Sequence, residues 1–594
     1  MISPPESSGS RRHFIQISLL LIITLVVFYP LLSAKFTNLD DVEMMMRFTA
    51  PDVPISIRHL FFPSGIDRYY RPLLISSFLL DKAIWQQEPA GFHLTNYLLH
   101  AANALLLYFI LVGLYQRLKI KQYLPPLFGA LLFAVHPLTC ESVAWISGRT
   151  DVMATFFCLA GFSFYLSDFR GRQVPVAICL LAGLLSKESA LSLVPVILIT
   201  ELIICRREDR SIKYTVSSLL TWGIIMFVPL LCYWEMRTGG IFKIDHGTQV
   251  ALSNKVTSFT AGSSHSYNIL PYVVNTGAAI AFYIKKLFIP FPLNFAINRI
   301  ASLPYFFIFT VLTFIITNQL LKKKIALAAW SLVMIMGFAP ALLVANSNIA
   351  WTPFAERYLY LACAIWAAAI LFNLNNFLRT HPNYRKSVLL ISSAIIAVWS
   401  GTTFQRTFVW HNDLSLWSAT IKSSPDSGKV MYKYGCALLA HARKKEGLQM
   451  LTRAAKLTKD KKWQSYALIA LGDNALRDNA DADLNYYREA LTANNGYQSQ
   501  QALAAYYQSR QAASEHERSL NITKAVKYYR LAYAKKAFPN YLYQIAILLR
   551  HSDPQEARRM YKEIIKKHPQ SEYAIFAKQC LVHFKDSKTT TGKP

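Results

Sequence analysis

Long apolar stretches separated by short polar segments fill the first 405 residues of this 594-residue chain. Residues 14–34 carry no charged side chain, and about 20 apolar residues suffice for a helix to cross a bilayer. Their length favours a retained span over a cleaved signal peptide. Further stretches run approximately over 93–115, 125–146, 151–169, 174–187, 189–205, 214–236, 267–289, 302–321, 325–345, 357–378 and 387–405. The pattern predicts an all-α protein that begins with a polytopic membrane helix bundle.

Short basic clusters follow alternate apolar stretches, near residues 117–121, 170–172, 206–213, 322–324 and 379–386. Such clusters mark cytoplasmic loops. They share one side only if the segment 267–289 does not cross fully, so we expect about 11 spans plus one interfacial or re-entrant helix. The first loop, 35–92, and the polar segments 136–149, 186–189, 238–266 and 346–357 then face the extracytoplasmic side.

After Trp410 the sequence becomes charged and rich in tyrosine, with no membrane-length apolar run. The strings MLTRAA (450–455), YYREAL (486–491), YYRLAY (528–533) and MYKEII (560–565) lie at offsets of 36, 42 and 32 residues. These offsets bracket the period of ~34 residues of tetratricopeptide repeats, and Pro539 and Pro569 follow two of the strings. We expect a membrane domain over 1–411 and a tetratricopeptide-like repeat domain over 412–594; an unrelated helical bundle is the alternative. A solenoid would offer a groove to extended peptides or partner proteins.

The formal charge of +29 comes from clusters between spans and from a scattered basic surface on the C-terminal part. This distribution favours topology signals and a basic soluble face over a nucleic-acid interface. The eight cysteines show no CxxC spacing, which argues against a disulfide framework and a zinc site. No Walker, GxGxxG, HExxH or GxSxG motif lies in a strand-to-helix context, so soluble nucleotide chemistry is not indicated.

An acidic pair, Asp40 and Asp41, heads the first loop in the string FTNLDDVE, together with Asn38 and Glu43. Paired carboxylates there could act as a general base toward a hydroxyl or bind a hard divalent cation. A helix N-cap or a solvated loop is the alternative, and composition alone favours it slightly.

Two further groups of polar residues have both a functional and a structural explanation. Arg68 and Arg71 are three residues apart, so on a helix they would face a phosphate together, or they would snorkel to the headgroups. His93, Asn96 and His100 recur at helical spacing within an apolar stretch, which is typical of a buried hydrogen-bonded seam.

The string FAVHPLTCESVAWISGRTD brings His136, Glu141, Arg149 and Asp151 into a break between two apolar stretches. Thr150 or Asp151 could cap the following helix. Capping does not explain His136 and Glu141, because ionisable groups in apolar surroundings are functional candidates by default.

Charged pairs interrupt two other apolar regions, Lys187-Glu188 and Glu356-Arg357. Adjacent residues on a helix point apart, so at least one of the first pair needs another partner. A lipid phosphate would suit Lys187, whereas an interfacial aromatic belt with an anchoring arginine is the alternative for the second pair.

The order of these strings resembles a known family. NLDD, RYYRPL, FHLTNYLLH, FAVHPLTCESVAWISGRTD, LLSKESAL, AERYLYL and RTFVWHNDLSLWSATIKSSPDS, followed by repeats, resemble the transmembrane and tetratricopeptide-repeat-containing proteins and their bacterial relatives. These belong to the GT-C superfamily of integral-membrane glycosyltransferases, and the resemblance covers nearly the whole chain. One departure is Thr139, where many relatives have a second histidine.

The resemblance implies a glycosyltransferase that moves a sugar, such as mannose, from a polyprenyl- or dolichyl-phosphate carrier to an extracytoplasmic acceptor. It implies that Asp40 and Asp41 are catalytic. The family's other motifs fall on His136, Glu141, Arg149, Asp151, Lys187, Glu188, Glu356 and Arg357.

In this mechanism Asp40 or Asp41 is the base, and Lys187, Arg357 and Arg149 neutralise the departing phosphate. A divalent metal at the acidic pair would share that task. The expected partners are the lipid carrier and a protein bound by extracytoplasmic repeats. The host membrane would be the inner or plasma membrane of a bacterium or the endoplasmic reticulum of a eukaryote.

We prefer a protein hydroxyl as acceptor, because the repeats would lie on the side of the acidic loop. A glycan or lipid acceptor is the nearer alternative, and a non-catalytic scaffold that works through its repeats is the more distant one.

Overall fold

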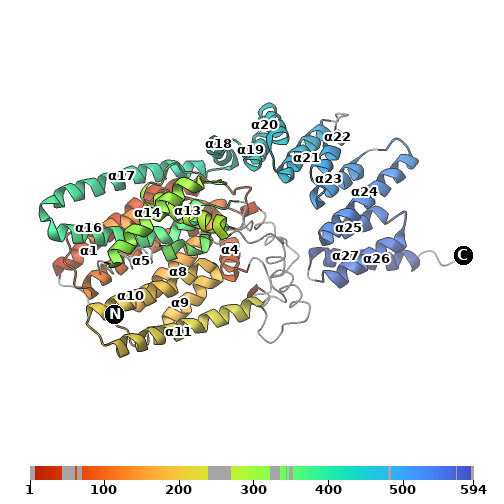
Figure 1. The fold of residues 1–594 in the computed structure, drawn as a ribbon. Coiled ribbons are helices and arrows are strands. Elements are labelled where there is room, and N and C mark those ends of the chain that lie inside the picture. The colour runs from red at the N-terminus through yellow and green to blue at the C-terminus, as the bar shows by residue number, and fades with distance from the viewer. Residues whose placement is uncertain are drawn as a thin grey trace. The chain divides into compact units, whose positions relative to one another are not determined.

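The computed structural model describes residues 7–42, 44, 60–62, 70–238, 269–321, 335–342, 344–346, 352–478, 483–510, 512–569 and 571–589. The chain divides into two compact units, one ending at Leu416 and the other beginning at Trp417. The regular secondary structure of both units is helical throughout the described residues, apart from one isolated bridge between Ile297 and Phe354 (Figure 1). The predicted all-helical fold class is therefore confirmed.

The first unit is a bundle of apolar helices. Its elements are α1 (Ser7–Phe28), η1 (Tyr29–Ser33), α4 (Pro72–Trp85), α5 (Pro89–Arg117), α6 (Pro126–Ala134), α7 (Thr139–Ala144), η2 (Ile146–Gly148), α8 (Arg149–Leu166), α9 (Gln173–Ser186), η3 (Glu188–Ser192), α10 (Leu193–Arg207), α11 (Ile212–Thr238), α13 (Ile269–Phe288), α14 (Ser302–Leu321), η4 (Glu356–Leu359), α16 (Tyr360–Thr380), η5 (Pro382–Tyr384) and α17 (Arg385–Val409). The boundary between the two units falls within α18 (Asp413–Ser423).

Six segments among the described residues are long and apolar enough to cross a membrane. They are Ser10–Ser33, Pro89–Arg117, Glu188–Arg207, Ile212–Thr238, Glu356–Thr380 and Pro382–Val409. Large apolar side chains point outward from several of them: Phe14 is 71% exposed, Ile212 82% and Leu390 73%. An apolar exterior of this kind is suited to lipid and not to water. The unit thus has the character of a multi-pass membrane bundle.

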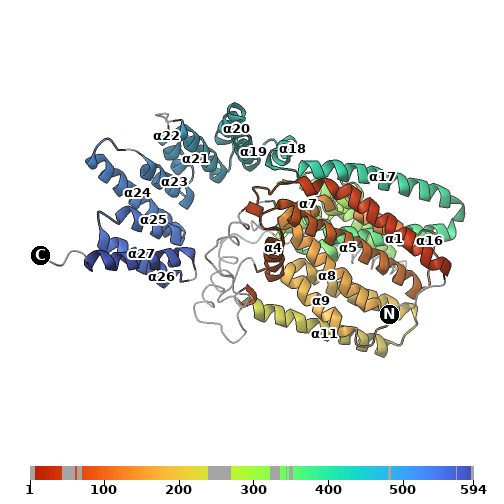
Figure 2. The same ribbon diagram turned by 180° about the vertical axis from the view of Figure 1, so that it is seen from behind.

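The polar breaks between these helices meet at one end of the bundle. Contacts between distant segments show this directly, because Asp41 contacts Ser147, Lys187 contacts Asp151, and Glu141 contacts Arg357. We call this region, residues 34–41, 136–149, 186–188 and 352–357, the polar end. The basic clusters near residues 117, 170–172, 206–213 and 379–386 lie at the opposite ends of the same helices, which Figure 2 shows running side by side.

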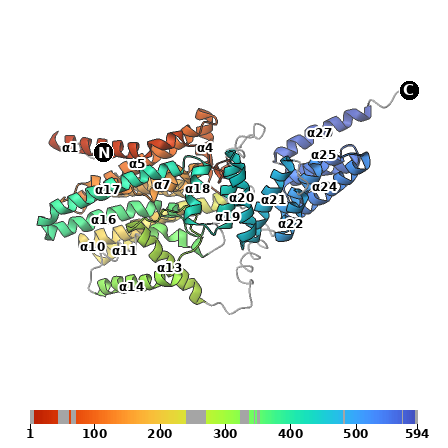
Figure 3. The same cartoon turned by 90° about the horizontal axis from the view of Figure 1, so that it is seen from above.

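Helix α13, which covers the segment expected to be interfacial or re-entrant, also reaches the polar end. It packs against α14 at one edge of the bundle (Figure 3). Its Lys286 is buried beside Glu356, and its Leu287 carbonyl accepts a hydrogen bond from His136. This helix is not among the six segments suited to crossing a membrane. The span count itself stays a prediction.

The second unit is a series of helix pairs. They are α19 (Gly428–Ala440) with α20 (Lys444–Leu457), α21 (Lys461–Arg477) with α22 (Asp483–Ala493), α23 (Tyr497–Ser509) with α24 (Glu515–Lys535), and α25 (Pro539–Leu549) with α26 (Pro554–Lys567), followed by α27 (Glu572–Thr589). Each of the four strings aligned above lies in the second helix of a pair. Small residues let the helices approach: a Cβ on Gly472 would lie 2.9 Å from the ring of Tyr487.

Candidate active site

The acidic pair is split between two environments. Asp41 is buried, and its carboxylate accepts four hydrogen bonds. Thr37 donates its N–H (3.3 Å) and hydroxyl (2.6 Å) to Oδ2, while Ser147 donates its N–H (3.0 Å) and hydroxyl (2.6 Å) to Oδ1. Burial raises the pKa of Asp41 above its ordinary value, although these hydrogen bonds oppose the rise. Of the pair, only Asp40 is exposed to solvent.

Two buried side chains, Asn96 and Arg149, stabilise the break between helices that contains Ser147. Asn96 on α5 donates to the carbonyls of three residues, Val143, Trp145 and Ile146, at 3.1–3.3 Å. Its oxygen accepts from Arg149 Nε at 2.6 Å. These bonds satisfy carbonyls that the interrupted helix leaves unpaired, so the break is a defined structure.

Arg149 makes its contacts inside the bundle. Its guanidinium pairs with Asp81 at 2.5 Å, donates to the Phe92 carbonyl at 2.8 Å and to Ser77 Oγ at 3.1 Å, and lies over the Phe78 ring. With the bond to Asn96, protein groups engage all three of its nitrogen atoms. Its predicted role at a phosphate stays a prediction, but the structure gives it an extensive structural role.

Glu141 and Arg357 form a buried pair across 216 positions of sequence, with 2.5 Å between Oε1 and Nη1. The Arg357 guanidinium also lies 5.2 Å from the centre of the Trp145 ring and 4.8 Å from that of Tyr358. Arg357 is thus fixed in place by one carboxylate and two aromatic faces.

A second cation stands beside it. Lys187 Nζ lies 2.5 Å from Asp151 Oδ1 and 5.5 Å from the centre of the same Tyr358 ring. Asp151 lies in the first turn of α8, where Gly148 is the N-cap and no side chain caps the helix. The capping role considered for Thr150 or Asp151 is therefore wrong, because the Asp151 carboxylate is turned toward the lysine.

Glu188 points away from Lys187, as expected for adjacent residues. Its two oxygens pair with two guanidiniums, Arg71 at 3.5 Å and Arg237 at 3.1 Å. Four cations, Arg71, Lys187, Arg237 and Arg357, thus gather at the polar end around three carboxylates.

Glu356 points away from Arg357 to a separate buried group. It accepts from Lys286 at 2.9 Å and from the Asn294 N–H at 2.8 Å, and Arg406 lies 4.0 Å away. His136 is close to this group. Its Nε2 contacts the Leu287 carbonyl at 3.1 Å, and its Nδ1 accepts the Leu138 N–H at 3.2 Å.

The seam expected on α5 is present at two of its three positions. Asn96 is bonded as described, and His100 contacts the Tyr360 hydroxyl at 2.6 Å and the Ala134 carbonyl at 2.9 Å. Both are structural links between helices. His93 is buried in the same helix.

Several of the sequence predictions lie outside the described residues, namely those on Glu43, Arg68, residues 239–266, the basic cluster 322–324 and residues 325–334. Within the described part of the chain, no group of three or more His, Cys, Asp and Glu side chains gathers as a metal site would require. Because both oxygens of Asp41 already accept hydrogen bonds, Asp40 is the member of the pair with a carboxylate available to a cation.

Sequence reasoning missed Asp81 and Arg237, and it did not connect Trp145 with Arg357. Asp81 interrupts the apolar string LLISSFLLDKAIW, so the rule applied to Glu141 would have found it. Arg237 ends an apolar stretch on the side of the polar loops. The contact between Trp145 and Arg357 has no local sequence signal.

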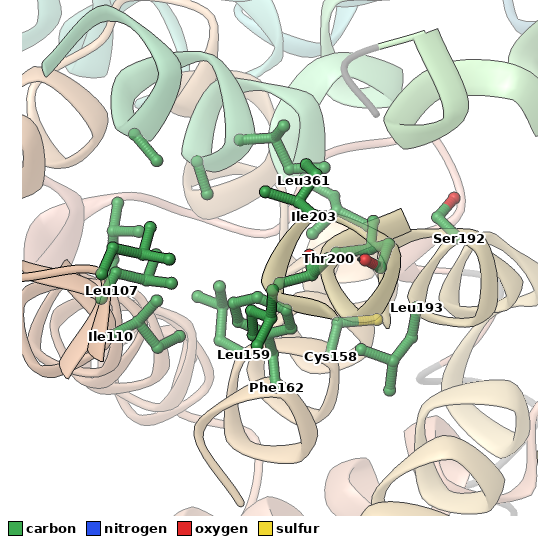
Figure 4. Close-up of a pocket in the computed structure, with 17 residues that line it drawn as sticks. Leu107, Ile110, Cys158, Leu159, Phe162, Ser192, Leu193, Thr200, Ile203 and Leu361 are labelled. Atoms are coloured by element: carbon green, nitrogen blue, oxygen red, sulfur yellow. Dashed lines mark hydrogen bonds between the residues drawn. The ribbon is translucent and has the colours of Figure 1, made fainter. Parts of the chain in front are cut away.

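An apolar pocket lies inside the bundle. It lies between α5, α8, α10 and α16, as Figure 4 shows, and extends from Ser192 and Leu361 to Leu118 and Ile204. Leu361 follows Arg357 by about one helical turn. The Ser192 and Thr200 hydroxyls at the wall donate to the carbonyls of Met336 and Val196, so the lining presents almost no polar surface.

No protein-family model matches the chain. A protein O-mannosyl-transferase of Caenorhabditis elegans is 25% identical over 487 residues, which cover 76% of this chain and 64% of that protein. The protein O-mannosyl-transferase TMTC3 of Homo sapiens is 23% identical over 432 residues, 66% of this chain and 45% of its own length.

A third relative matches a shorter region. The protein O-mannosyl-transferase TMTC2 of Mus musculus is 29% identical over 185 residues, 29% of this chain and 21% of its own length. The chain thus spans less than two thirds of each of these three proteins. The relationship predicted from the order of the motifs is confirmed: the relatives of this chain are protein O-mannosyl-transferases of the transmembrane and tetratricopeptide-repeat-containing family.

Proposed function

We propose that this chain is a membrane glycosyltransferase that moves a sugar, mannose, from a polyprenyl- or dolichyl-phosphate carrier to a hydroxyl group of a protein. The names of its relatives support the reaction class. The donor and its orientation are inferred from the polar end and from the pocket beside it.

The observation that carries the proposal is the group of four cations at the polar end. Arg71 and Arg237 share Glu188, while Lys187 and Arg357 flank one tyrosine ring. These four cations contact three carboxylates, Glu141, Asp151 and Glu188, and charge-assisted hydrogen bonds from such cations to a phosphate are among the stronger polar contacts.

The apolar pocket supports a lipid-linked donor over a nucleotide sugar. Its wall has almost no polar surface, and one end of it lies about one helical turn from Arg357. A hydrocarbon chain in the pocket would place its phosphate against Lys187 and Arg357. The phosphate would then be held where charge develops as it leaves.

Asp40 is the proposed base. It would take the proton of the acceptor hydroxyl as that oxygen attacks carbon 1 of the sugar, while the bond from carbon 1 to the phosphate oxygen breaks and the phosphate keeps the electron pair. Asp41 would position Asp40 by holding the loop to Ser147. A divalent cation, if the reaction uses one, would be held through Asp40.

The basic clusters support an extracytoplasmic location of the reaction. They lie at the helix ends opposite the polar end, and basic loops face the cytoplasm. A repeat unit on the same side as the polar end would be able to present protein acceptors.

The test is transfer of radiolabelled mannose from mannosyl-phosphoryl-polyprenol to a serine- and threonine-containing protein by the purified full-length chain. Asp40→Asn should lower the rate by about 100-fold or more, because a positioned base contributes about 10²–10⁴. Asp168→Asn is the matched control, since Asp168 is an exposed aspartate at the opposite end of the bundle. An unchanged rate in Asp40→Asn would contradict the assignment of the base, and label found only in lipid or glycan would contradict the protein acceptor.

A further inference from the structure

Three buried polar atoms near Arg357 have no hydrogen-bond partner within the described structure. They are Glu141 Oε2, Asp151 Oδ2 and Trp145 Nε1. Their residues are 1%, 5% and 7% exposed. A buried polar atom without a partner is costly, and such atoms in native proteins usually bind a ligand or an ordered water.

The two carboxylates are arranged alike. Each gives one oxygen to a cation at 2.5 Å, Glu141 to Arg357 and Asp151 to Lys187, and each leaves its second oxygen free of partners. The Trp145 ring lies under the Arg357 guanidinium, which brings its N–H to the same place. Each of the two cations proposed to hold the phosphate therefore has beside it a carboxylate with one unpaired oxygen, and the Trp145 ring lies next to Arg357.

This set of atoms combines two hydrogen-bond acceptors and one donor. Free carboxylate oxygens repel a phosphate, but they accept strongly from hydroxyl groups. A sugar supplies such hydroxyls, and its oxygen atoms accept from an indole N–H. A sugar joined to a phosphate matches both halves of the group, because the cations take the phosphate and the free atoms take the sugar.

We propose that Glu141 and Asp151 recognise the sugar of the donor by accepting hydrogen bonds from its hydroxyls, and that Trp145 Nε1 donates to a sugar oxygen. The inference rests on the proposed function, since it assumes a sugar phosphate as donor. It assigns sugar selectivity to carboxylates whose ion pairs alone would indicate a purely structural role.

The test compares two probes on the full-length protein in lipid nanodiscs, mannosyl-phosphoryl-polyprenol and the same polyprenyl phosphate without sugar. Glu141→Gln and Asp151→Asn each keep an oxygen for the cation and replace the other oxygen by an amide group. Each should weaken binding of the mannosylated carrier about tenfold, equivalent to about 1.4 kcal/mol. Binding of the sugar-free carrier should be unchanged or tighter, because the site loses one negative charge.

Two further variants keep the test decisive. Trp145→Phe retains a ring under Arg357 and removes only the N–H. It should therefore weaken binding of the mannosylated carrier alone, by about 2- to 10-fold. Glu201→Gln is the control, because Glu201 is a buried carboxylate that already accepts from the Tyr165 and Ser218 hydroxyls. It should alter neither affinity.

The inference would be overturned if the three variants weakened binding of both carriers equally, or weakened binding of neither. These variants are Glu141→Gln, Asp151→Asn and Trp145→Phe. A wild-type protein that binds neither carrier would instead contradict the donor class on which the proposed function depends.

Discussion

Asp40 and Asp41 are neighbours in sequence, yet the fold gives them different tasks. Asp41 accepts four hydrogen bonds and joins the first loop to the turn at Ser147, while Asp40 remains exposed. A buried carboxylate that receives this many donors is a structural anchor, and the energetic cost of removing it differs from the cost of removing an exposed one.

Asp41→Asn should destabilise the protein by about 1–3 kcal/mol, because the amide nitrogen would face either the Thr37 or the Ser147 donors and leave them unpaired. Asp40→Asn should change stability by no more than roughly 0.5 kcal/mol, as is usual for exposed positions. Thermal unfolding in detergent measures both. Equal midpoints for the two variants would show that the four hydrogen bonds do not stabilise the fold.

The raised pKa of Asp41 predicts a pH effect of definite sign. The folded protein holds this proton more tightly than the unfolded chain, so the contribution to stability is fully present below the ordinary value of 3.8. It is lost as the pH rises through the raised pKa of the folded state. The unfolding midpoint of the wild type, relative to Asp41→Asn, should therefore fall over this window. If the unfolding midpoint of the wild type, relative to that of Asp41→Asn, instead rises with pH, the raised pKa of Asp41 is contradicted.

Sequence alone indicated that at least one of Lys187 and Glu188 needed another partner, and it identified Arg357 as a site candidate, because ionisable groups in apolar stretches are rare. It could not identify the partners. Asp151, Arg237 and Glu141 are brought to them by helix packing, which no local pattern encodes. The different environments of Asp40 and Asp41 were not predictable from the sequence either, because the burial of Asp41 involves Ser147, more than 100 residues away.

At the scale of elements, the break between α6 and α8 is the feature that builds the site. The break places Trp145 beside Arg357 and Ser147 beside Asp41. Asn96 on α5 and Arg149 on α8, which are bonded to each other, stabilise its shape. Sequence predicted a break here from Pro137 and the charged residues around it. The hydrogen bonds that give the break its shape come from side chains on neighbouring helices.

Arg149→Met should destabilise the bundle by about 3–5 kcal/mol, because it leaves Asp81 as an uncompensated buried charge. Adding Asp81→Leu should restore much of the loss, since removing a whole buried pair is often neutral. Unfolding midpoints in detergent and polyprenyl phosphate binding by the folded fraction are the measurements. Normal stability with weakened binding in Arg149→Met would instead support the phosphate role predicted from the family.

At the scale of the whole molecule, hydropathy and repeat offsets were enough to predict a helical membrane part followed by helix pairs. Both signals extend over many residues, so local irregularities do not erase them. Span number is harder, because α13 combines membrane-like length with a buried lysine, and α6, α9 and α14 are short or marginal by composition. The side of the membrane on which each later loop lies then depends on whether single helices cross fully.

Cysteine labelling in sealed vesicles tests sidedness. In a background lacking the exposed Cys232, a membrane-impermeant maleimide should label Asp40→Cys from one side and Lys386→Cys from the other, because the basic clusters mark the cytoplasmic face. Lys459→Cys, in the second unit, should be labelled from the same side as Asp40→Cys. If Lys459→Cys is labelled together with Lys386→Cys, the repeats cannot present acceptors to the polar end.

The pair between Glu141 and Arg357 also bears on how the protein is made. The ribosome adds 216 residues between the two partners, which takes about 10 to 40 s at ~5–20 residues per second. During that interval the early helices hold a carboxylate whose cation does not yet exist. The nascent bundle must keep Glu141 protonated, hydrated or shielded by the insertion machinery until η4 arrives. A chain interrupted before η4 would retain this unpaired acid, and it would be a clear substrate for membrane quality control.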